Sequence, residues 1–348
     1  MDLDNKDSYK TLDSLGIGEA LELFPDQVLT CWQQAYSANI PRFAPKSVIV
    51  SGMGGSSNAA KILQGLYEAD LKIPFEVYND YGLPAWVNSN TLVVANSYSG
   101  NTEETLSAIE AANKINAKVL GVATGGKIGE MIKAGTIAGA IVTPGLTNPS
   151  GYPKSGLGVS FGALAGALSK AGILNINPAE MSAALTEVGE IRKTWDVKDT
   201  AKWINGNLPV LFGGKPLIGS LNAGRNAACE ISRNLTSFYD FPEVNHVLIE
   251  ATQKPDFIRE KTKYLFFLSK FNHARVLTRY KVTGQIFKEQ GLDFKSYALK
   301  GTTKLAQGLE LPHYAAWIGF YLSILQNTDP GPEPWIIKLK ESLAQPVH

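Results

Sequence analysis

The stretch SVIVSGMGGSS, residues 47–57, joins a short run of β-branched residues to a glycine-rich turn. Apolar residues at helical spacing follow directly, in residues 59–67. A buried strand, a tight turn and a helix in this order are typical of an α/β unit whose parallel sheet is covered on both faces. The stretch therefore predicts the first strand and helix of a doubly wound domain.

Strand and helix patterns alternate on both sides of this stretch. In the first half we expect further strands at residues 75–78, 91–95, 118–123 and 139–143, with helices at 102–115 and 128–134. In the second half we expect strands at residues 209–212, 264–269 and 296–300, with helices at 217–235, 274–290, 302–327 and 334–344. The expected fold class is α/β, with two doubly wound parallel-sheet domains.

The length of 348 residues also suggests two domains, since a domain commonly has about 150 residues. Residues 1–45 are expected to form an N-terminal helical leader that ends at Pro41 and Pro45. We expect the first domain at residues 46–175, a helical linker at 176–204, and the second domain with its C-terminal helix at 205–348.

Composition excludes several classes of protein. A net charge of +1 argues against a dedicated nucleic-acid binder, which needs a basic face. No apolar stretch has the length of a membrane span, and no targeting segment is visible. Two cysteines, Cys31 and Cys229, cannot build a disulfide framework or a structural zinc site. We therefore expect a cytoplasmic protein with reduced thiols, no membrane partner and no nucleic-acid partner.

Two strand-to-helix loops are candidates for an anion site, because ligands bind beyond the carboxyl ends of parallel strands. The first is the glycine-rich turn above, and the second reads SYSGNTEE at residues 97–104. Hydroxyls and free N–H groups at a helix start suit a phosphate monoester. The glycine-rich turn alone is weak support for an anion site. It does not match the dinucleotide-binding pattern G-x-G-x-x-G, because Ser57 stands where that pattern needs a third glycine. The residues expected to hold a phosphate are Gly54, Gly55, Ser56, Ser97, Ser99 and Thr102.

SYSGNTEE resembles the phosphate loop of the sugar isomerase (SIS) domain. Its pairing with GMGGS earlier in the chain is similar to the bifunctional phosphoglucose/phosphomannose isomerases. Further segments that match this family are YGLP at 81–84, TGG at 124–126, PEVNH at 242–246, DP at 329–330 and LK at 339–340. The resemblance covers nearly the whole chain. It implies two SIS domains that interconvert glucose 6-phosphate and fructose 6-phosphate, and often act on mannose 6-phosphate too, and that use no metal or other cofactor.

The resemblance also implies which residues carry the reaction by ring opening and enediolate proton transfer. Glu230 is expected to move the proton between C1 and C2, since it precedes His246 by the sixteen positions that the family shows. Glu243 is the rival for this role, and Cys229 and Ile231 beside Glu230 depart from the asparagines usual in the family.

The other expected catalytic residues come from the same resemblance. His246 opens the sugar ring and is expected in a long loop over residues 240–255. The family's homodimer implies that it reaches the partner subunit's site. Lys340 in the last helix reaches the sugar during ring opening. Lys154 follows Pro153 where the family has an arginine for the enediolate, and lysine carries the charge without a bidentate fork. Gly331 stands near a position where relatives active on mannose 6-phosphate often have threonine.

Three alternatives remain beside this isomerase. A sugar-phosphate-binding regulator built from SIS domains would keep the phosphate loop without catalysis, and Glu230, His246 and Lys340 together argue against it. An aminosugar-forming isomerase would need an N-terminal cysteine and the loop sequence SQSGET, whereas this chain begins Met1-Asp2 and has SYSGNT. A dehydrogenase lacks support because the third glycine is missing.

Overall fold

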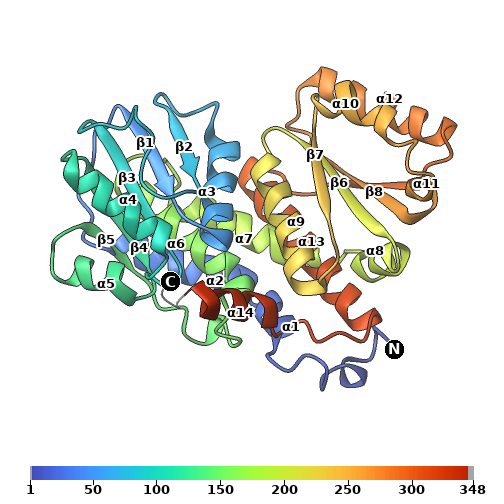
Figure 1. Ribbon diagram of the computed structural model, residues 1–348, viewed down its shortest axis with the longest axis horizontal. Coiled ribbons are helices and arrows are strands. Elements are labelled where there is room, and N and C mark those ends of the chain that lie inside the picture. The colour runs from blue at the N-terminus through green and yellow to red at the C-terminus, as the bar shows by residue number, and fades with distance from the viewer. Residues whose placement is uncertain (1, 344–348) are drawn as a thin grey trace.

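The computed structural model describes residues 2–343 and contains two parallel β-sheets, each flanked by helices (Figure 1). The first sheet has the strand order β2-β1-β3-β4-β5, and the second has the order β7-β6-β8-β9. The strands are β1 (Ser47–Ser51), β2 (Phe75–Tyr78), β3 (Thr91–Ser97), β4 (Lys118–Ala123), β5 (Ala138–Ile141), β6 (Leu208–Gly214), β7 (Ser237–Phe241), β8 (Thr262–Leu268) and β9 (Phe294–Ala298). All neighbouring strands are parallel, which confirms the predicted α/β class with two parallel-sheet domains.

Alternate residues of the first sheet enter two different layers of the core. On β3, Leu92 and Val94 pack in one layer, whereas Val93 and Ala95 pack in the other. The inner layer contains α2 (Phe24–Ser37), α3 (Gly54–Tyr67) and α6 (Leu157–Lys170), and the outer layer contains α4 (Glu103–Lys114) and α5 (Gly126–Lys133). Both faces of the sheet are therefore covered, as its continuous apolar strands require.

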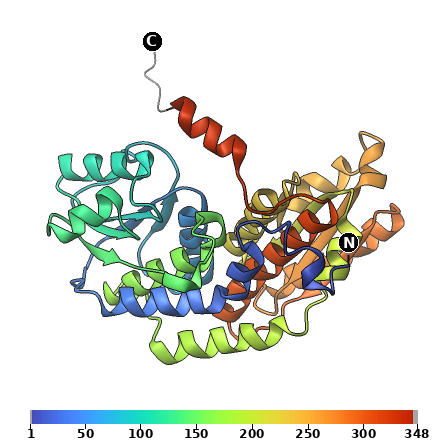
Figure 2. The same ribbon diagram turned by 90° about the horizontal axis from the view of Figure 1, so that it is seen from below.

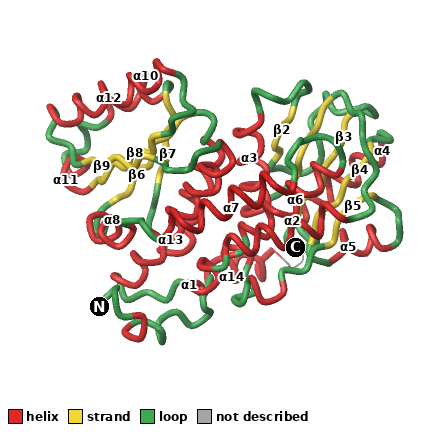
Figure 3. The backbone as a smooth tube through the Cα atoms, turned by 180° about the vertical axis from the view of Figure 1, so that it is seen from behind, coloured by secondary structure: helices red, strands yellow, loops and turns green. Residues whose placement is uncertain are grey.

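The inner faces of the two sheets share one hydrophobic core. Leu265 and Phe267 of β8 belong to the same cluster as Leu92 and Val94 of β3. Between the sheets lie α3, α7 (Pro178–Arg192), α9 (Ile218–Ser232) and α13 (Lys304–Leu325), with α8 (Val197–Ile204) packed on α13 (Figure 3). The outer face of the second sheet packs on α10 (Val244–Ala251) and α12 (Ala274–Glu289), and α11 (Phe257–Lys261) precedes β8. Burial of apolar area across this shared core holds the two halves together.

The N-terminal segment begins with the short 3₁₀ helix η1 (Lys6–Ser8), followed by α1 (Ile17–Glu22) and α2. Pro25 lies in the first turn of α2, where its missing N–H leaves no hydrogen bond unmade. It therefore lies at the start of a helix and does not break one. The chain ends in α14 (Pro334–Leu343), and Ala344 of the predicted last helix lies outside the described residues. No helix within residues 2–343 is both long and apolar enough to cross a membrane.

One region was predicted wrongly. Residues 240–255 were expected to form a long loop and residues 217–235 a single helix. In the structure, α9 ends at Ser232 because Arg233 adopts the left-handed conformation, and the edge strand β7 and the helix α10 follow. Both elements bury few side chains, with only Phe241 buried on β7 and Val244 on α10, so their apolar periodicity is weak. His246 thus lies on a helix.

The close crossing of α3 and α9 brings the two halves of the chain together at one edge. A Cβ atom added at Gly219 would lie 1.9 Å from the backbone oxygen of Lys61 and one added at Gly65 would lie 2.6 Å from that of Pro216. These contacts pair the end of α3 with the start of α9, so the two helices run antiparallel. The start of α3 and the end of α9 consequently meet at the same place.

We predict that Gly219→Ala destabilises the protein by about 1–3 kcal/mol, because the added methyl group forces the two helices apart. The matched control is Gly189→Ala on α7, where an added Cβ meets nothing within 4 Å. That change should stabilise the protein by about 0.5–1 kcal/mol through higher helix propensity. Urea unfolding of both variants measures the difference. Equal effects of the two substitutions would contradict the close crossing.

Candidate active site

The loop of residues 97–102 lies at the carboxyl edge of the first sheet, between β3 and α4. The hydroxyls of Ser97 and Thr102 are hydrogen-bonded to each other at 2.7 Å. The Ser97 Oγ also accepts from the N–H of Gly100 at 3.1 Å, and the Ser99 Oγ accepts from the N–H of Asn101 at 3.2 Å. These bonds fold the loop around the start of α4, where unpaired N–H groups favour an anion.

Ser56 ties this loop to the start of α3. Its buried Oγ accepts from the N–H of Tyr98 at 3.0 Å. Gly54 and Gly55 open α3 directly before it, and a Cβ at Gly55 would lie 3.6 Å from the carbonyl oxygen of Pro153. The structure thus brings all six residues that the sequence predicts for phosphate binding to one edge of the first sheet. It also brings the segment containing Lys154 next to them.

Glu230 reaches this edge because of a polar seam between α3 and α9. The Oδ1 atom of Asn58 on α3 accepts hydrogen bonds from the Nδ2 atoms of Asn222 at 2.8 Å and Asn226 at 2.9 Å. The three amide side chains satisfy each other in a largely buried position and fix the register of the antiparallel helices. Glu230 lies one turn beyond Asn226, at the end of α9 that adjoins the start of α3.

Lys154 clamps the segment that leads into the last helix. It lies on a short 3₁₀ helix, η3 (Pro153–Ser155), and its side chain is 1% exposed. Its Nζ donates hydrogen bonds to the carbonyl oxygens of Pro330, at 2.7 Å, and Gly331. The Nζ is also 3.7 Å from Oε1 of Glu333. Burial lowers the pKa of Lys154, while the negative charge of Glu333 opposes that shift.

A second cation holds the same segment. The Nη2 atom of Arg233 donates to the carbonyl oxygens of Asp329 at 2.9 Å and Pro332 at 2.7 Å. Within the segment, the Asp329 carboxylate accepts from the N–H of Gly331 at 2.8 Å. Residues 329–332 are therefore held from both sides by charged donors, and charge-assisted bonds of this kind are the stronger ones.

Gly331 is buried against the N-terminal segment. A Cβ at this position would lie 2.8 Å from Cγ of Leu15, so no larger residue fits without movement of that side chain. Asp13, just before Leu15, accepts from the N–H groups of Ile17 and Gly18 and so fixes the start of α1. The packing of Leu15 against this position therefore favours glycine at residue 331.

Glu333 is the site residue that the sequence did not reveal. It follows the clamped segment directly, its side chain is 16% exposed, and its carboxylate pairs with Lys154. A glutamate before a helix is usually explained by the helix dipole, so nothing in the sequence singled it out. Only the fold shows that the start of α14 lies beside Glu230.

The environment of Glu230 shifts its acidity toward neutral pH. Burial raises the pKa of Glu230 to about 7, and the negative charge of Glu333 adds to the rise. The positive charges of Lys154 and Arg225 act in the opposite direction. A carboxylate with a pKa near the pH of its surroundings is suited to general acid–base catalysis, because it both takes and returns a proton readily.

Two of the predicted catalytic residues are not joined to Glu230 within this chain. Lys340 is exposed on α14, which projects from the body of the protein (Figure 2). His246 is exposed on α10, at the far end of the second half (Figure 1). Among the residues that the structure describes, neither side chain makes a hydrogen bond or ion pair with Glu230, Lys154 or Glu333. The rival Glu243 is likewise exposed, just before α10.

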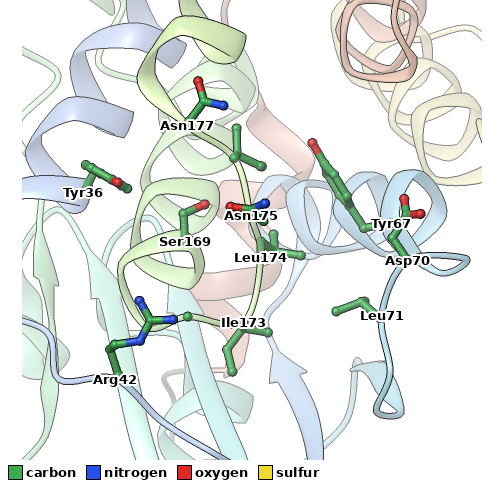
Figure 4. A pocket seen from close by; sticks show the side chains of 12 residues that line it. Tyr36, Arg42, Tyr67, Asp70, Leu71, Ser169, Ile173, Leu174, Asn175 and Asn177 are labelled. Atoms are coloured by element: carbon green, nitrogen blue, oxygen red, sulfur yellow. The ribbon is translucent and has the colours of Figure 1, made fainter.

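A separate cavity of about 470 Å³ lies at the opposite, amino-terminal end of the first sheet (Figure 4). It is lined by residues after the ends of α2, α3 and α6, among them Arg42, Asp70 and Asn175. None of the predicted site residues lines it. Across residues 2–343 there is also no group of three or more His, Cys, Asp or Glu side chains placed to hold a metal ion.

Taken together, the edge offers an anion site, a carboxylate of raised pKa and a buried cation. The candidate anion site lies at the starts of α3 and α4, and Glu230, Glu333 and Lys154 lie beside it. Such an arrangement can anchor a phosphate ester and move a proton on the carbon chain attached to it.

Comparison with known protein families agrees with the fold of two parallel-sheet domains. Residues 43–129 match the model of the SIS domain, and residues 195–343 match that of the bacterial phospho-glucose isomerase C-terminal SIS domain. Similar solved structures include tagatose-6-phosphate ketose/aldose isomerase from Escherichia coli, with a TM-score of 0.65 at 14% identity over 96% of this chain and 92% of that chain. Another is glucosamine-6-phosphate deaminase from Thermotoga maritima, with a TM-score of 0.64 at 15% identity over 91% of this chain and 98% of that chain. At these identities the likeness concerns the fold.

Curated relatives are similar over most of their length. The bifunctional phosphoglucose/phosphomannose isomerase of Aquifex aeolicus is 30% identical over 306 residues, which cover 86% of this chain and 90% of the relative. The enzyme of the same name from Caldicellulosiruptor bescii is 29% identical over 343 residues, covering 94% of this chain and 98% of the relative. The chain therefore belongs to the family of bifunctional phosphoglucose/phosphomannose isomerases.

Proposed function

We propose that the protein is an aldose–ketose isomerase that interconverts glucose 6-phosphate and fructose 6-phosphate. The observation that carries this proposal is Glu230, a partly buried carboxylate of raised pKa, beside the phosphate-binding edge of the first sheet. Mannose 6-phosphate is proposed as the secondary substrate, because the buried Gly331 offers no hydroxyl to the sugar. Discrimination between two such epimers is commonly a matter of about 1–3 kcal/mol in transition-state binding.

The phosphate is proposed to bind at the starts of α3 and α4. Ser97, Ser99 and Thr102 supply hydroxyl groups, and the N–H groups of both helix starts supply further donors. Gly54 and Gly55 allow close approach of the backbone, and Ser56 holds the two loops together through Tyr98. Anchoring the phosphate places the other end of the open-chain sugar toward Glu230.

Glu230 is proposed to move the proton between the two carbons. Its carboxylate removes the hydrogen at C2 of the open-chain aldose, and the C–H electron pair forms the C1–C2 double bond while the C1 carbonyl oxygen takes the negative charge. The resulting enediolate recovers a proton at C1 from the same carboxyl group. Lys154 and Arg225, whose charges already act on Glu230, stabilise the negative charge of this intermediate.

The remaining sequence expectations stay part of this proposal. They are the domain boundaries at residues 46, 176 and 205, and a cytoplasmic location with no nucleic-acid or membrane partner. The reaction as written needs no resident metal or organic cofactor, because the base and the charge stabilisation come from side chains.

We predict that the conversion of fructose 6-phosphate to glucose 6-phosphate falls about tenfold per pH unit below pH 7. The reason is that Glu230 must be ionised to act as a base, and its pKa is about 7. Glu230→Gln should lower kcat by roughly 10²–10⁴. A coupled assay of glucose 6-phosphate formation measures both effects.

Glu243→Gln is the matched control, since Glu243 is exposed and should be dispensable for the proton transfer. An active Glu230→Gln protein with an inactive Glu243→Gln protein would reverse the two assignments. If the wild-type protein binds hexose 6-phosphates but never converts them, it is the SIS-type regulator instead of an enzyme.

We further propose a homodimer in which His246 opens the sugar ring in the partner subunit's site. Three features support this. His246 is exposed, and it lies on α10, away from Glu230 at the end of α9. Exposed apolar side chains also lie near it in the sequence. Val247 is 61% exposed and Leu235 is 75% exposed. Apolar side chains of this kind are common at interfaces between subunits. Lys340, on the projecting helix α14, is proposed to reach the sugar in the same assembly.

Mixing two inactive variants tests the shared site. We predict that His246→Ala subunits co-refolded with Glu230→Gln subunits regain activity, because one site of each heterodimer then has both residues intact. Each parent homodimer should be nearly inactive. The activity of the mixture is measured after heterodimer formation has been verified with two affinity tags. Verified heterodimers with no more activity than the parents would assign His246 to its own chain's site.

A further inference from the structure

A second carboxylate lies in the site beside Glu230, and the mechanism above does not use it. Both Glu333 and Glu230 interact with the buried Lys154. The Oε1 atom of Glu333 is 3.7 Å from the Lys154 Nζ, and the positive charge of Lys154 favours the ionised form of Glu230. We propose that Glu333 is a further catalytic residue, which carries the hydroxyl proton between O1 and O2 of the enediolate. This proposal rests on the isomerase function proposed above and assigns the step that it leaves open.

The reaction needs two proton transfers, one on carbon and one on oxygen. From fructose 6-phosphate, Glu230 removes a proton from C1, and the negative charge moves onto O2 while O1 keeps its hydrogen. To form the aldose, O1 must lose that hydrogen and O2 must be neutralised. In the proposed relay, ionised Glu333 takes the proton from O1–H and gives it to O2. Glu230 then delivers its proton to C2, the C1–O1 carbonyl forms, and both carboxylates return to their starting state.

Several contacts hold Glu333 at the right place for this step. The backbone before it is fixed by Lys154, through Pro330 and Gly331, and by Arg233, through Asp329 and Pro332. Its own carbonyl oxygen accepts from the N–H of Ile337 at 3.0 Å, so it adjoins the first turn of α14. The carboxylate is thereby held beside a cation and at a helix start.

The charge of Glu333 also acts directly on Glu230. It is the second cause, after burial, of the raised pKa of Glu230. The groups that act on Glu230 are Glu333 from the start of α14, Lys154 from η3 and Arg225 from α9 itself. Glu333 is the carboxylate among them, and it is partly exposed, so a sugar hydroxyl can reach it. His246 does not compete for this step, because ring opening is a separate and earlier reaction.

Hydrogen exchange separates the two proton transfers. Fructose 6-phosphate is incubated with enzyme in deuterated buffer at about pD 8, where Glu230 is ionised in all variants that retain it. Mass spectrometry measures deuterium at C1 of recovered fructose 6-phosphate, and a coupled assay measures glucose 6-phosphate. Glu333→Gln should lower isomerisation by about 10²-fold and exchange by less than about tenfold. Without the relay, the enediolate returns to fructose 6-phosphate with deuterium from the solvent.

Two variants are compared with Glu333→Gln. Glu230→Gln should lose exchange and isomerisation together, because it removes the carbon base. Glu341→Gln, an exposed carboxylate on the same helix α14, should match the wild type in both measurements. Thermal unfolding of each variant checks that the fold is retained.

Parallel loss of exchange and isomerisation in Glu333→Gln, or loss of neither, would overturn the relay while leaving the proposed isomerase intact. A wild-type protein that neither isomerises nor exchanges would overturn the proposed function itself.

Discussion

A single buried ammonium group organises the proposed active site. The Nζ of Lys154 joins two parts of the chain, η3 after the first sheet and the segment of residues 330–333. In that segment it contacts the carbonyl oxygens of Pro330 and Gly331 and the carboxylate of Glu333. A charge this well buried is tolerated only when it is paired and its donors are satisfied. The position of Glu333 beside Glu230 depends on this arrangement, whereas the raised pKa of Glu230 comes first from burial and only second from the charge of Glu333.

The scaffold behind Lys154 holds the elements of the proposed site against each other. The two sheets share one hydrophobic core, and α3 and α9 approach so closely that glycine is needed where they cross. The amide seam of Asn58, Asn222 and Asn226 adds a specific register to that packing. Phosphate loop and proton-transferring carboxylate come from different sheets, and the seam keeps them at a fixed separation. Rigid placement of reacting groups is a large part of what catalysis requires.

The sequence allowed much of this to be predicted, because its strongest signals are local. Apolar strands followed by turns give the two parallel sheets, and SYSGNTEE at residues 97–104 gives the phosphate loop. What could not be predicted depends on contacts between distant segments. Glu333 resembles an ordinary residue at a helix start, and Arg233 resembles an ordinary residue at a helix end, until the fold brings both against residues 329–332 and Lys154.

The same reasoning accounts for the error at β7 and α10. An edge strand and a short surface helix bury little, so their sequences carry little apolar periodicity. His246 was therefore expected in a loop and lies on α10. The motif PEVNH pointed to His246 only through the resemblance to the family. Because His246 is exposed, its role must be tested on the assembled protein.

The pKa of Glu230 is the most direct test of the proposed charge cluster, which consists of Glu230, Glu333 and Lys154. In protein labelled with ¹³C at the glutamate carboxyl groups, NMR titration follows each carboxylate, and Glu230→Gln assigns the resonance. The structure predicts that Glu230 titrates near pH 7 in the wild type. In Lys154→Met its pKa should rise further, because the cation that favours the charged form is gone. A Glu230 carboxyl that titrates near its ordinary value of about 4.3, and that does not respond to the loss of Lys154, would contradict the proposed charge cluster.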